Sequence, residues 1–178
     1  MEGKYIVTGP PGCGKTNLLV LRAAYMTKAG LTNLKILTFA TALNGFIRTG
    51  VVGKGLDPDQ VDRHIRWSRA FAISHDSSNR EKIDEIEKFE QRRRVLAEEC
   101  KKIQGQLGSG AKMHQAILVD EVQDLFSEEL DVIDRASDRI MLAGDNKQKV
   151  YRGGNALQHA VDLGFSVQNL TMHYRMGH

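Results

Sequence analysis

The chain is poor in cysteine and proline, and it has no long apolar run. It contains two cysteines, Cys13 and Cys100, and three prolines among 178 residues. Two cysteines cannot build a disulfide framework, and nothing matches C-x-x-C metal spacing, so we expect a reduced, cytoplasmic protein without bound zinc. No segment has the length and apolarity of a signal peptide or a membrane span, and we expect neither.

The chain also lacks a large excess of charge of either sign. Lysine and arginine total 25 against 22 aspartate and glutamate, a net charge of +3. This mild excess permits a nucleic-acid partner without arguing for one, because nucleic-acid-binding domains usually carry a stronger basic footprint. With 41% hydrophobic residues and 178 residues in all, the chain is long enough for one domain with a core and a small insertion.

What the sequence does contain is an alternation of apolar strands and helices. Strands are predicted at 4–9, 34–40, 116–121, 139–145 and 166–170, and helices at 15–30, 41–50, 127–136 and 155–164. Apolar strands that alternate with helices predict an α/β fold, in which helices cover both faces of a parallel sheet.

The interval 53–112 breaks this alternation, because it contains no convincing strand. We expect a helical stretch at 58–75 and one long charged helix at 79–107. Apolar residues of this helix form two rows, Phe89, Leu96 and Ile103 in one and Ile86, Cys100 and Leu107 in the other. Arg93 interrupts the second row. One narrow seam favours a solvated helical insertion over a helix dedicated to a partner. We therefore divide the chain into a core, 1–52 and 113–178, and an insertion, 53–112.

The stretch GPPGCGKT, residues 9–16, matches the phosphate-binding loop G-x-x-x-x-G-K-[ST] between a predicted strand and a predicted helix. Its glycines, Gly9, Gly12 and Gly14, let the backbone approach phosphate closely. Lys15 is expected to reach the β- and γ-phosphates of ATP, and the Thr16 hydroxyl to bind Mg²⁺. The alternative is a chance match in a glycine-rich turn. For Cys13, redox control is conceivable, but a small residue that fills a variable loop position is favoured.

Polar residues also follow the other strands at the sheet edge where ligands of parallel sheets bind. Asp120 is placed to hold Mg²⁺ through water and Glu121 to orient or deprotonate a water, although carboxylates are also common at helix N-termini. The Gln148 amide can sense a γ-phosphate, unless it belongs to a simple Asp-Asn turn. Phe39, after the second strand, either stacks on a base or seals the sheet against the next helix.

Five segments in this order resemble motifs I, Ia, II, III and IV of UvrD/Rep-like superfamily 1 helicases. They are GPPGCGKT, ILTFATALNGFIRTG, ILVDEVQDL, IMLAGDNKQKVYRGGNAL and LTMHYRM. The pairing of D-E-V-Q-D with G-D-x-x-Q-x-x-Y is much more specific than the phosphate loop alone. The resemblance covers most of the chain except roughly 51–114, where the family carries a helical insertion.

The resemblance implies a RecA-like P-loop NTPase domain that grips single-stranded DNA or RNA and uses ATP and Mg²⁺. It implies that Lys15 and Thr16 bind phosphate and Mg²⁺, with Cys13 and Asn17 in the same loop. Further implied roles are metal support for Asp120, the catalytic base for Glu121, a γ-phosphate contact for Gln148 and Arg175, adenine stacking for Tyr174, and nucleic-acid contacts for Phe39 and Tyr151. A terminal segment that packs on the surface is the alternative for Tyr174 and Arg175.

The chain departs from the family pattern in four places. Only eight residues precede Gly9, where the family has a glutamine that reads adenine. Gly153 stands near the place where the family has an aromatic residue that stacks on DNA. Motif Ib is matched only distantly, by the segment around Trp67. The sequence ends three residues after Arg175, without the second RecA-like domain and its arginine finger. We therefore expect the isolated chain to bind nucleotide, to hydrolyse it slowly and not to unwind DNA.

Two other functions remain open at the level of sequence. One is a stand-alone P-loop module that changes shape with ATP and acts on a protein partner. Stimulation by single-stranded DNA would favour the helicase interpretation over this one. The other is a nucleotide or small-molecule kinase, against which stand Gln148 and the absence of an arginine-rich lid.

Overall fold

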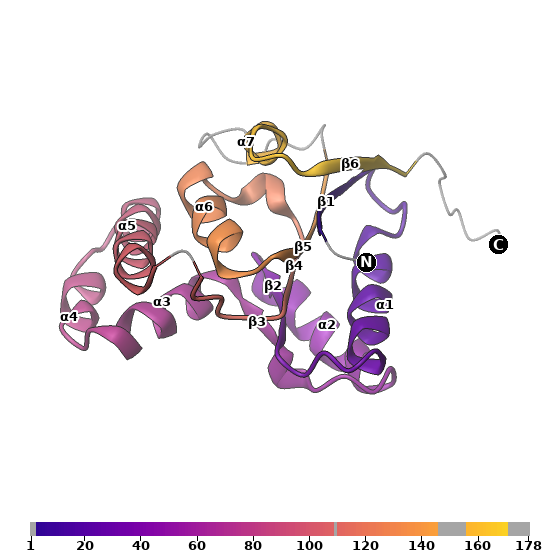
Figure 1. Ribbon diagram of the computed structural model, residues 1–178, viewed down its shortest axis with the longest axis horizontal. Helices are drawn as coiled ribbons and strands as arrows, with labels where there is room; N and C mark the ends of the chain where they lie inside the picture. Colours follow the sequence, from indigo (N-terminus) through magenta and orange to yellow (C-terminus); the bar gives the residue numbers. More distant parts are fainter. Residues whose placement is uncertain (1–2, 109, 146–155, 171–178) are drawn as a thin grey trace.

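A six-stranded sheet forms the centre of the computed structural model, which describes residues 3–108, 110–145 and 156–170 (Figure 1). The strands are β1 (Gly3–Thr8), β2 (Leu34–Thr38), β3 (Val61–Arg63), β4 (Ala116–Val119), β5 (Arg139–Gly144) and β6 (Ser166–Asn169). Their order is β3-β2-β4-β5-β1-β6, and every paired strand runs parallel to its neighbour. All carboxyl ends therefore share one edge, as predicted for an α/β fold.

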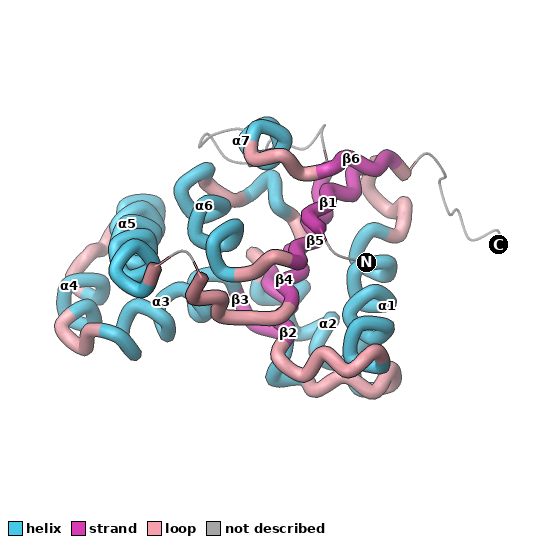
Figure 2. The backbone as a smooth tube through the Cα atoms, viewed as in Figure 1, coloured by secondary structure: helices cyan, strands magenta, loops and turns pink. Residues whose placement is uncertain are grey.

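Helices cover both faces of this sheet (Figure 2). The α-helices are α1 (Lys15–Lys28), α2 (Thr41–Val52), α3 (His64–His75), α4 (Asn79–Asp84), α5 (Phe89–Leu107), α6 (Ser127–Ala136) and α7 (Ala156–Asp162). Two 3-10 helices, η1 (Pro58–Gln60) and η2 (Val122–Asp124), complete the described elements. Within these residues, no helix has the length and apolarity that a membrane span needs.

The central strands β2, β4 and β5 are largely buried because each side of the sheet meets a different helical layer. In β4 all four residues are buried. Leu118 packs into the cluster built by α1 and α2, whereas Ile117 and Val119 pack into the cluster that includes α3, α5, α6 and α7. Side chains alternate across a strand, so a run of four apolar residues serves two cores at once.

One strand lies where the sequence analysis expected none. β3 falls inside the interval 53–112 and pairs with β2, Ile36 opposite Val61 and Thr38 opposite Arg63. The expectation of an interval without a strand was therefore wrong. β3 has only three residues, of which Val61 alone is buried, and so short a strand leaves no period-2 pattern to detect. The sheet thus includes residues on both sides of the predicted boundary at 52.

The predicted long helix at 79–107 is also wrong, because it is two helices, α4 and α5. Ile83 and Leu96 are both fully buried in one cluster. In a continuous helix these two residues, 13 positions apart, would point roughly 140° away from each other. The break at 85–88 turns Ile83 toward the core, and the Arg92 Nε donates a hydrogen bond of 2.9 Å to the Ile86 carbonyl across it.

Helix α5 packs on one stripe between α3 and α6, which confirms the predicted packing of the insertion. Leu96, Cys100 and Ile103 are buried as expected, but Phe89 and Leu107 remain 46% and 47% exposed. Arg93 does not interrupt the seam but lies buried within it.

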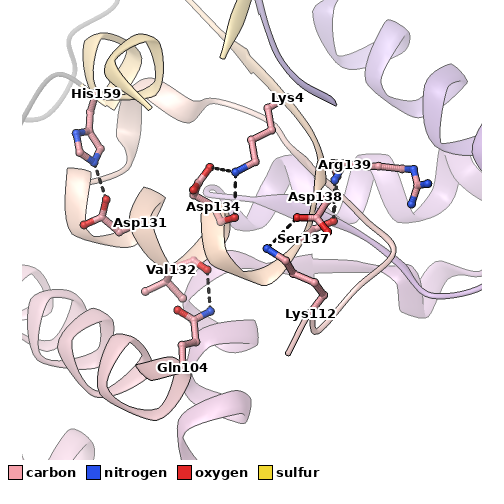
Figure 3. Close-up of polar contacts among 10 residues, drawn as sticks. All are labelled: Lys4, Gln104, Lys112, Asp131, Val132, Asp134, Ser137, Asp138, Arg139 and His159. Atoms are coloured by element: carbon pink, nitrogen blue, oxygen red, sulfur yellow. Dashed lines mark hydrogen bonds and ion pairs between the residues drawn. The ribbon is translucent and has the colours of Figure 1, made fainter. Parts of the chain in front are cut away.

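Polar contacts join the helices of this layer to one another and to the sheet (Figure 3). The Gln104 Nε2 of α5 donates to the Val132 carbonyl of α6 at 2.9 Å. On the other side of α6, Asp131 pairs with His159 of α7 at 2.7 Å. The Lys4 ammonium of β1 pairs with Asp134 at 2.6 Å. Helix α6 is therefore tied to α5, to α7 and to the sheet.

Candidate nucleotide-binding site

The loop between β1 and α1 has the backbone that its glycines predict. Gly12 and Gly14 have φ angles of 76° and 89°, in the left-handed region where a side chain is strained. At Gly9 a Cβ atom would lie 2.7 Å from the Cys13 Sγ and 3.0 Å from the Leu170 carbonyl oxygen. Position 9 therefore requires glycine, because Cys13 and Leu170 leave no space for a side chain. Cys13 is buried and fills the inside of the loop.

The Lys15 side chain bends back into this loop. Lys15 is the first residue of α1 and is 8% exposed. Its Nζ donates hydrogen bonds to the carbonyls of Gly9 at 2.8 Å and Pro10 at 3.0 Å, and it lies 3.8 Å from the Cys13 Sγ. A cation enclosed by a glycine-rich loop at a helix N-terminus is suited to bind a phosphate group. Asn17, in the next position of α1, is exposed.

A hydrogen bond joins the loop to the end of β4. The Thr16 Oγ1 donates to the Asp120 Oδ2 at 2.6 Å, and the Glu121 backbone N–H donates to the other oxygen, Oδ1, at 3.0 Å. Burial raises the pKa of Asp120 above its usual value, the Thr16 hydrogen bond opposes the shift, and the charge of Glu121 adds to it. A hydroxyl and a carboxylate in contact are oxygen ligands of the kind that Mg²⁺ prefers, so these two residues fit that ion.

Glu121 has a strained backbone. Its φ and ψ angles are 54° and 46°, and among the described residues no other non-glycine has a positive φ. Such conformations cost energy and cluster at functional sites. The Gln123 Nε2 donates a hydrogen bond to the Glu121 Oε2, and the Gln123 Oε1 accepts one of 3.1 Å from the Asp145 backbone N–H. Gln123 therefore fixes the carboxylate of Glu121 relative to the end of β5.

The sequence analysis missed Gln123 and the role of Gly144. A Cβ atom at Gly144 would lie 2.7 Å from the Val122 Cγ1 and 2.8 Å from the Gln123 Oε1. Gly144 therefore lets the turn after β4 lie directly against β5. The signal for Gln123 was present in the segment D-E-V-Q-D, but only its two acidic residues at the strand end were interpreted.

The strand order places the end of β5 between the phosphate loop and Glu121, because β5 lies between β1 and β4. Asp145, which directly follows β5, is buried. Gln148 and Tyr151, predicted three and six residues further on, lie outside the described residues, as do Tyr174 and Arg175.

Phe39 packs on the core rather than standing free at the sheet edge. It is only partly exposed, packs against the cluster of α3, α5 and α6, and its ring centre lies 4.7 Å from the Arg93 guanidinium. Phe39 thus seals the sheet, as one alternative predicted, but against α5 and its neighbours rather than against the next helix in the chain, α2.

Comparisons with known proteins add one structural likeness. No family model matches the chain, and no curated protein matches it. One solved structure that it resembles is described as "Structural Basis for DNA Unwinding at Forked dsDNA by two coordinating Pif1 helicases". The superposition has a TM-score of 0.47 at 18% sequence identity, and it covers 99% of this chain and 41% of the other. The chain thus spans less than half of that protein, and a likeness of this size decides neither family nor activity.

Proposed function

We propose that the chain is the ATP-binding motor domain of a UvrD-like superfamily 1 DNA helicase or translocase, which couples ATP hydrolysis to binding of single-stranded nucleic acid. The observation that carries this proposal is the 2.6 Å hydrogen bond between Thr16 and Asp120. It brings a phosphate loop and an acidic strand end, 104 residues apart in sequence, to one point of the sheet edge.

Each residue then has a physical role. Backbone N–H groups of the loop and the Lys15 ammonium hold the β- and γ-phosphates. Thr16 and Asp120 hold Mg²⁺, which when bound neutralises charge on the phosphate oxygens. Glu121, oriented by Gln123, accepts a proton from the attacking water or aligns it. Because the fold brings these groups together before the reaction, little reorganisation would be needed as negative charge moves to the leaving ADP.

The proposal also includes residues outside the described part of the chain. Gln148 and Arg175 contact the γ-phosphate, Tyr174 stacks on adenine, and Tyr151 with Phe39 contacts single-stranded DNA or RNA. Translocation needs two bodies that close on ATP, so a second RecA-like domain in the same or another chain is part of the proposal. An arginine finger from such a domain is worth on the order of 10³–10⁵ in rate, so turnover without it is slow.

Binding of a fluorescent ATP analogue with Mg²⁺ tests the site. Lys15→Ala should weaken binding strongly, whereas Lys28→Ala, at the exposed other end of the same helix, should bind like the wild type. Glu121→Gln should bind normally and lose hydrolysis. Equal affinity of the Lys15 and Lys28 variants would refute a nucleotide site in this loop.

A titration with single-stranded DNA, and in parallel with RNA, separates the helicase interpretation from a regulatory module. We expect either polymer to raise the ATPase rate or to tighten ATP binding. ATP binding that is indifferent to both would instead favour a module that acts on a protein partner. Rapid unstimulated turnover would contradict the need for a second domain.

A further inference from the structure

Helix α5 buries a charged residue beside the turn that carries Glu121. Arg93 is 2% exposed, and a buried cation is costly unless it is fully paired. Its Nε donates to the Glu129 Oε1 at 2.8 Å, and its Nη2 donates to the Glu129 Oε2 and, at 2.8 Å, to the Asp124 carbonyl. Arg93 thus connects the inserted segment to two points of the chain that follows β4.

Both points lie in the segment that follows the candidate catalytic residue Glu121, and one of them is hydrogen-bonded to it. Asp124 is the last residue of η2, and its backbone N–H donates to the Glu121 carbonyl at 3.0 Å. Glu129 also accepts a hydrogen bond of 2.9 Å from the Phe126 backbone N–H. The guanidinium therefore ties two points of this segment, Asp124 and Glu129, to helix α5, and it reaches Glu121 through the Asp124 backbone.

Aromatic rings enclose the guanidinium and restrict its movement. Its central carbon lies 4.1 Å from the centre of the Phe126 ring, 4.7 Å from that of Phe39 and 5.8 Å from that of Phe89. Rings around a cation exclude water and strengthen its remaining interactions. Phe39 follows β2, so the same group also touches the strand end that we propose to lie near nucleic acid.

Stability alone is a weak reason for such a pair, because buried ion pairs can often be replaced by apolar residues without loss. The neighbouring pair offers a contrast. Arg94 and Glu128 join the same two helices at 2.6 Å, but both are exposed. The Arg94 guanidinium also lies 4.2 Å from the centre of the Phe126 ring, but among the described contacts it makes no hydrogen bond to the backbone of the turn. Only the buried pair holds the backbone at Asp124.

We propose that Arg93 is a positioning residue, supplied by the insertion, that holds the Glu121 turn in the geometry needed for ATP hydrolysis. The inserted helices are then part of the active site's support rather than an addition to its surface. This inference rests on the proposed function.

The test compares two double variants. Arg93→Met with Glu129→Gln removes the buried charges, while the glutamine can still accept from the Phe126 N–H. Arg94→Met with Glu128→Gln makes the same change in the exposed pair. We expect the first to lower the hydrolysis rate on the order of 10- to 100-fold with ATP affinity within about twofold, because small misplacements of a catalytic group cost this much. The second should change neither quantity.

Two further measurements separate positioning from general damage. In a Glu121→Gln background, the buried-pair variant should cause no further loss of hydrolysis, because groups that act as a unit are not additive. Hydrogen exchange at the amides of Asp124 and Leu125 should be faster in the buried-pair variant than in the exposed-pair variant. Hydrolysis equal to the control, or ATP binding weakened in proportion, would overturn the inference. If the wild type does not bind ATP, the proposed function fails, and amide exchange alone then decides whether Arg93 fixes the turn.

Discussion

Helices α1 and α2 lie on one face of the sheet and α3, α5, α6 and α7 on the other (Figure 2). The first layer meets the sheet through an apolar cluster, whereas the second includes a buried ion pair. On the first face the cluster runs from Leu19 and Ala23 of α1 to Ile47 of α2. On the second, Arg93 and Glu129 lie buried between α5 and α6. Apolar packing tolerates small shifts, but a buried ion pair has few acceptable geometries. The two layers therefore differ in how strictly their contacts fix the chain, and in our proposal the second fixes the orientation of the Glu121 turn.

Removing one partner of the buried pair should have the largest effect. Arg93→Met leaves the Glu129 carboxylate without its cation in a closed site, and we expect a loss of about 3–5 kcal/mol in the free energy of unfolding. Urea denaturation measures it. Arg94→Met, in the exposed pair, should cost at most about 1 kcal/mol. Similar losses in both variants would mean that burial of the pair does not distinguish the two layers.

A cavity in either layer should be the next largest effect. Leu19 of α1 and Leu96 of α5 are both almost fully buried. Replacement of either by alanine should cost about 2–5 kcal/mol, measured by the same denaturation. The comparison predicts in addition that Leu96→Ala weakens ATP hydrolysis more than ATP binding, since Leu96 lies one turn from Arg93. Exposed Leu21→Ala serves as the control on α1. Equal effects of Leu19→Ala and Leu96→Ala on hydrolysis would argue against this asymmetry.

The sequence was sufficient for most of the sheet and for the glycine-rich turn between β1 and α1. Long apolar strands with turn residues at their ends, and a loop motif with fixed spacing, carry local signals that survive without tertiary context. β3 and the break between α4 and α5 could not be predicted, because they depend on contacts with residues remote in sequence. Val61 joins the sheet only because β2 is there to pair with it, and Ile83 turns inward only because a core exists beneath it.

The same limit applies to the candidate site. The placement of Lys15, Thr16 and Asp120 at one edge of the sheet could be predicted, because their motifs fix both identity and position, whereas their roles stay predictions. Arg93 was interpreted as an interruption of an apolar row, since nothing nearby in sequence pairs with it. Its partner Glu129 lies 36 positions away. A charged residue at a core-facing position of an amphipathic helix, such as this one, is a signal worth testing against distant acidic residues.

Acid should weaken the layer of inserted helices selectively. The Trp67 Nε1 of α3 donates to the His114 Nε2 at 3.0 Å, and the His114 Nδ1 donates to the Asn33 Oδ1 at 2.7 Å, so His114 is neutral here. Burial, with a smaller effect of Lys35, lowers its pKa from 6.5 to about 4. An unfolded chain takes up the proton first, so this contribution is complete above pH 6.5 and is lost as the pH falls toward 4.

We expect the loss to be about 2 kcal/mol over this range, after a discount for the solvent that still reaches the ring. His114→Gln should remove that part of the pH dependence, and His75→Gln, at the exposed end of α3, should retain it. Denaturation at several pH values gives the two slopes. If the free energy of unfolding fell equally with pH in the wild type and in His114→Gln, His114 would not contribute to the pH dependence of stability.

The smallest effect concerns two helix glycines, one in each layer. Gly45 of α2 and Gly105 of α5 have open space where a Cβ would lie, and neither has a positive φ. Alanine in their place should stabilise the chain by about 0.5–1 kcal/mol in α2, and by less in α5, where Gly105 lies in the last turn. Thermal denaturation resolves such differences. If Gly105→Ala destabilised the chain while Gly45→Ala stabilised it, the end of α5 would be constrained by more than helix propensity. The rigidity that we assign to Arg93 would then extend along the whole inserted helix.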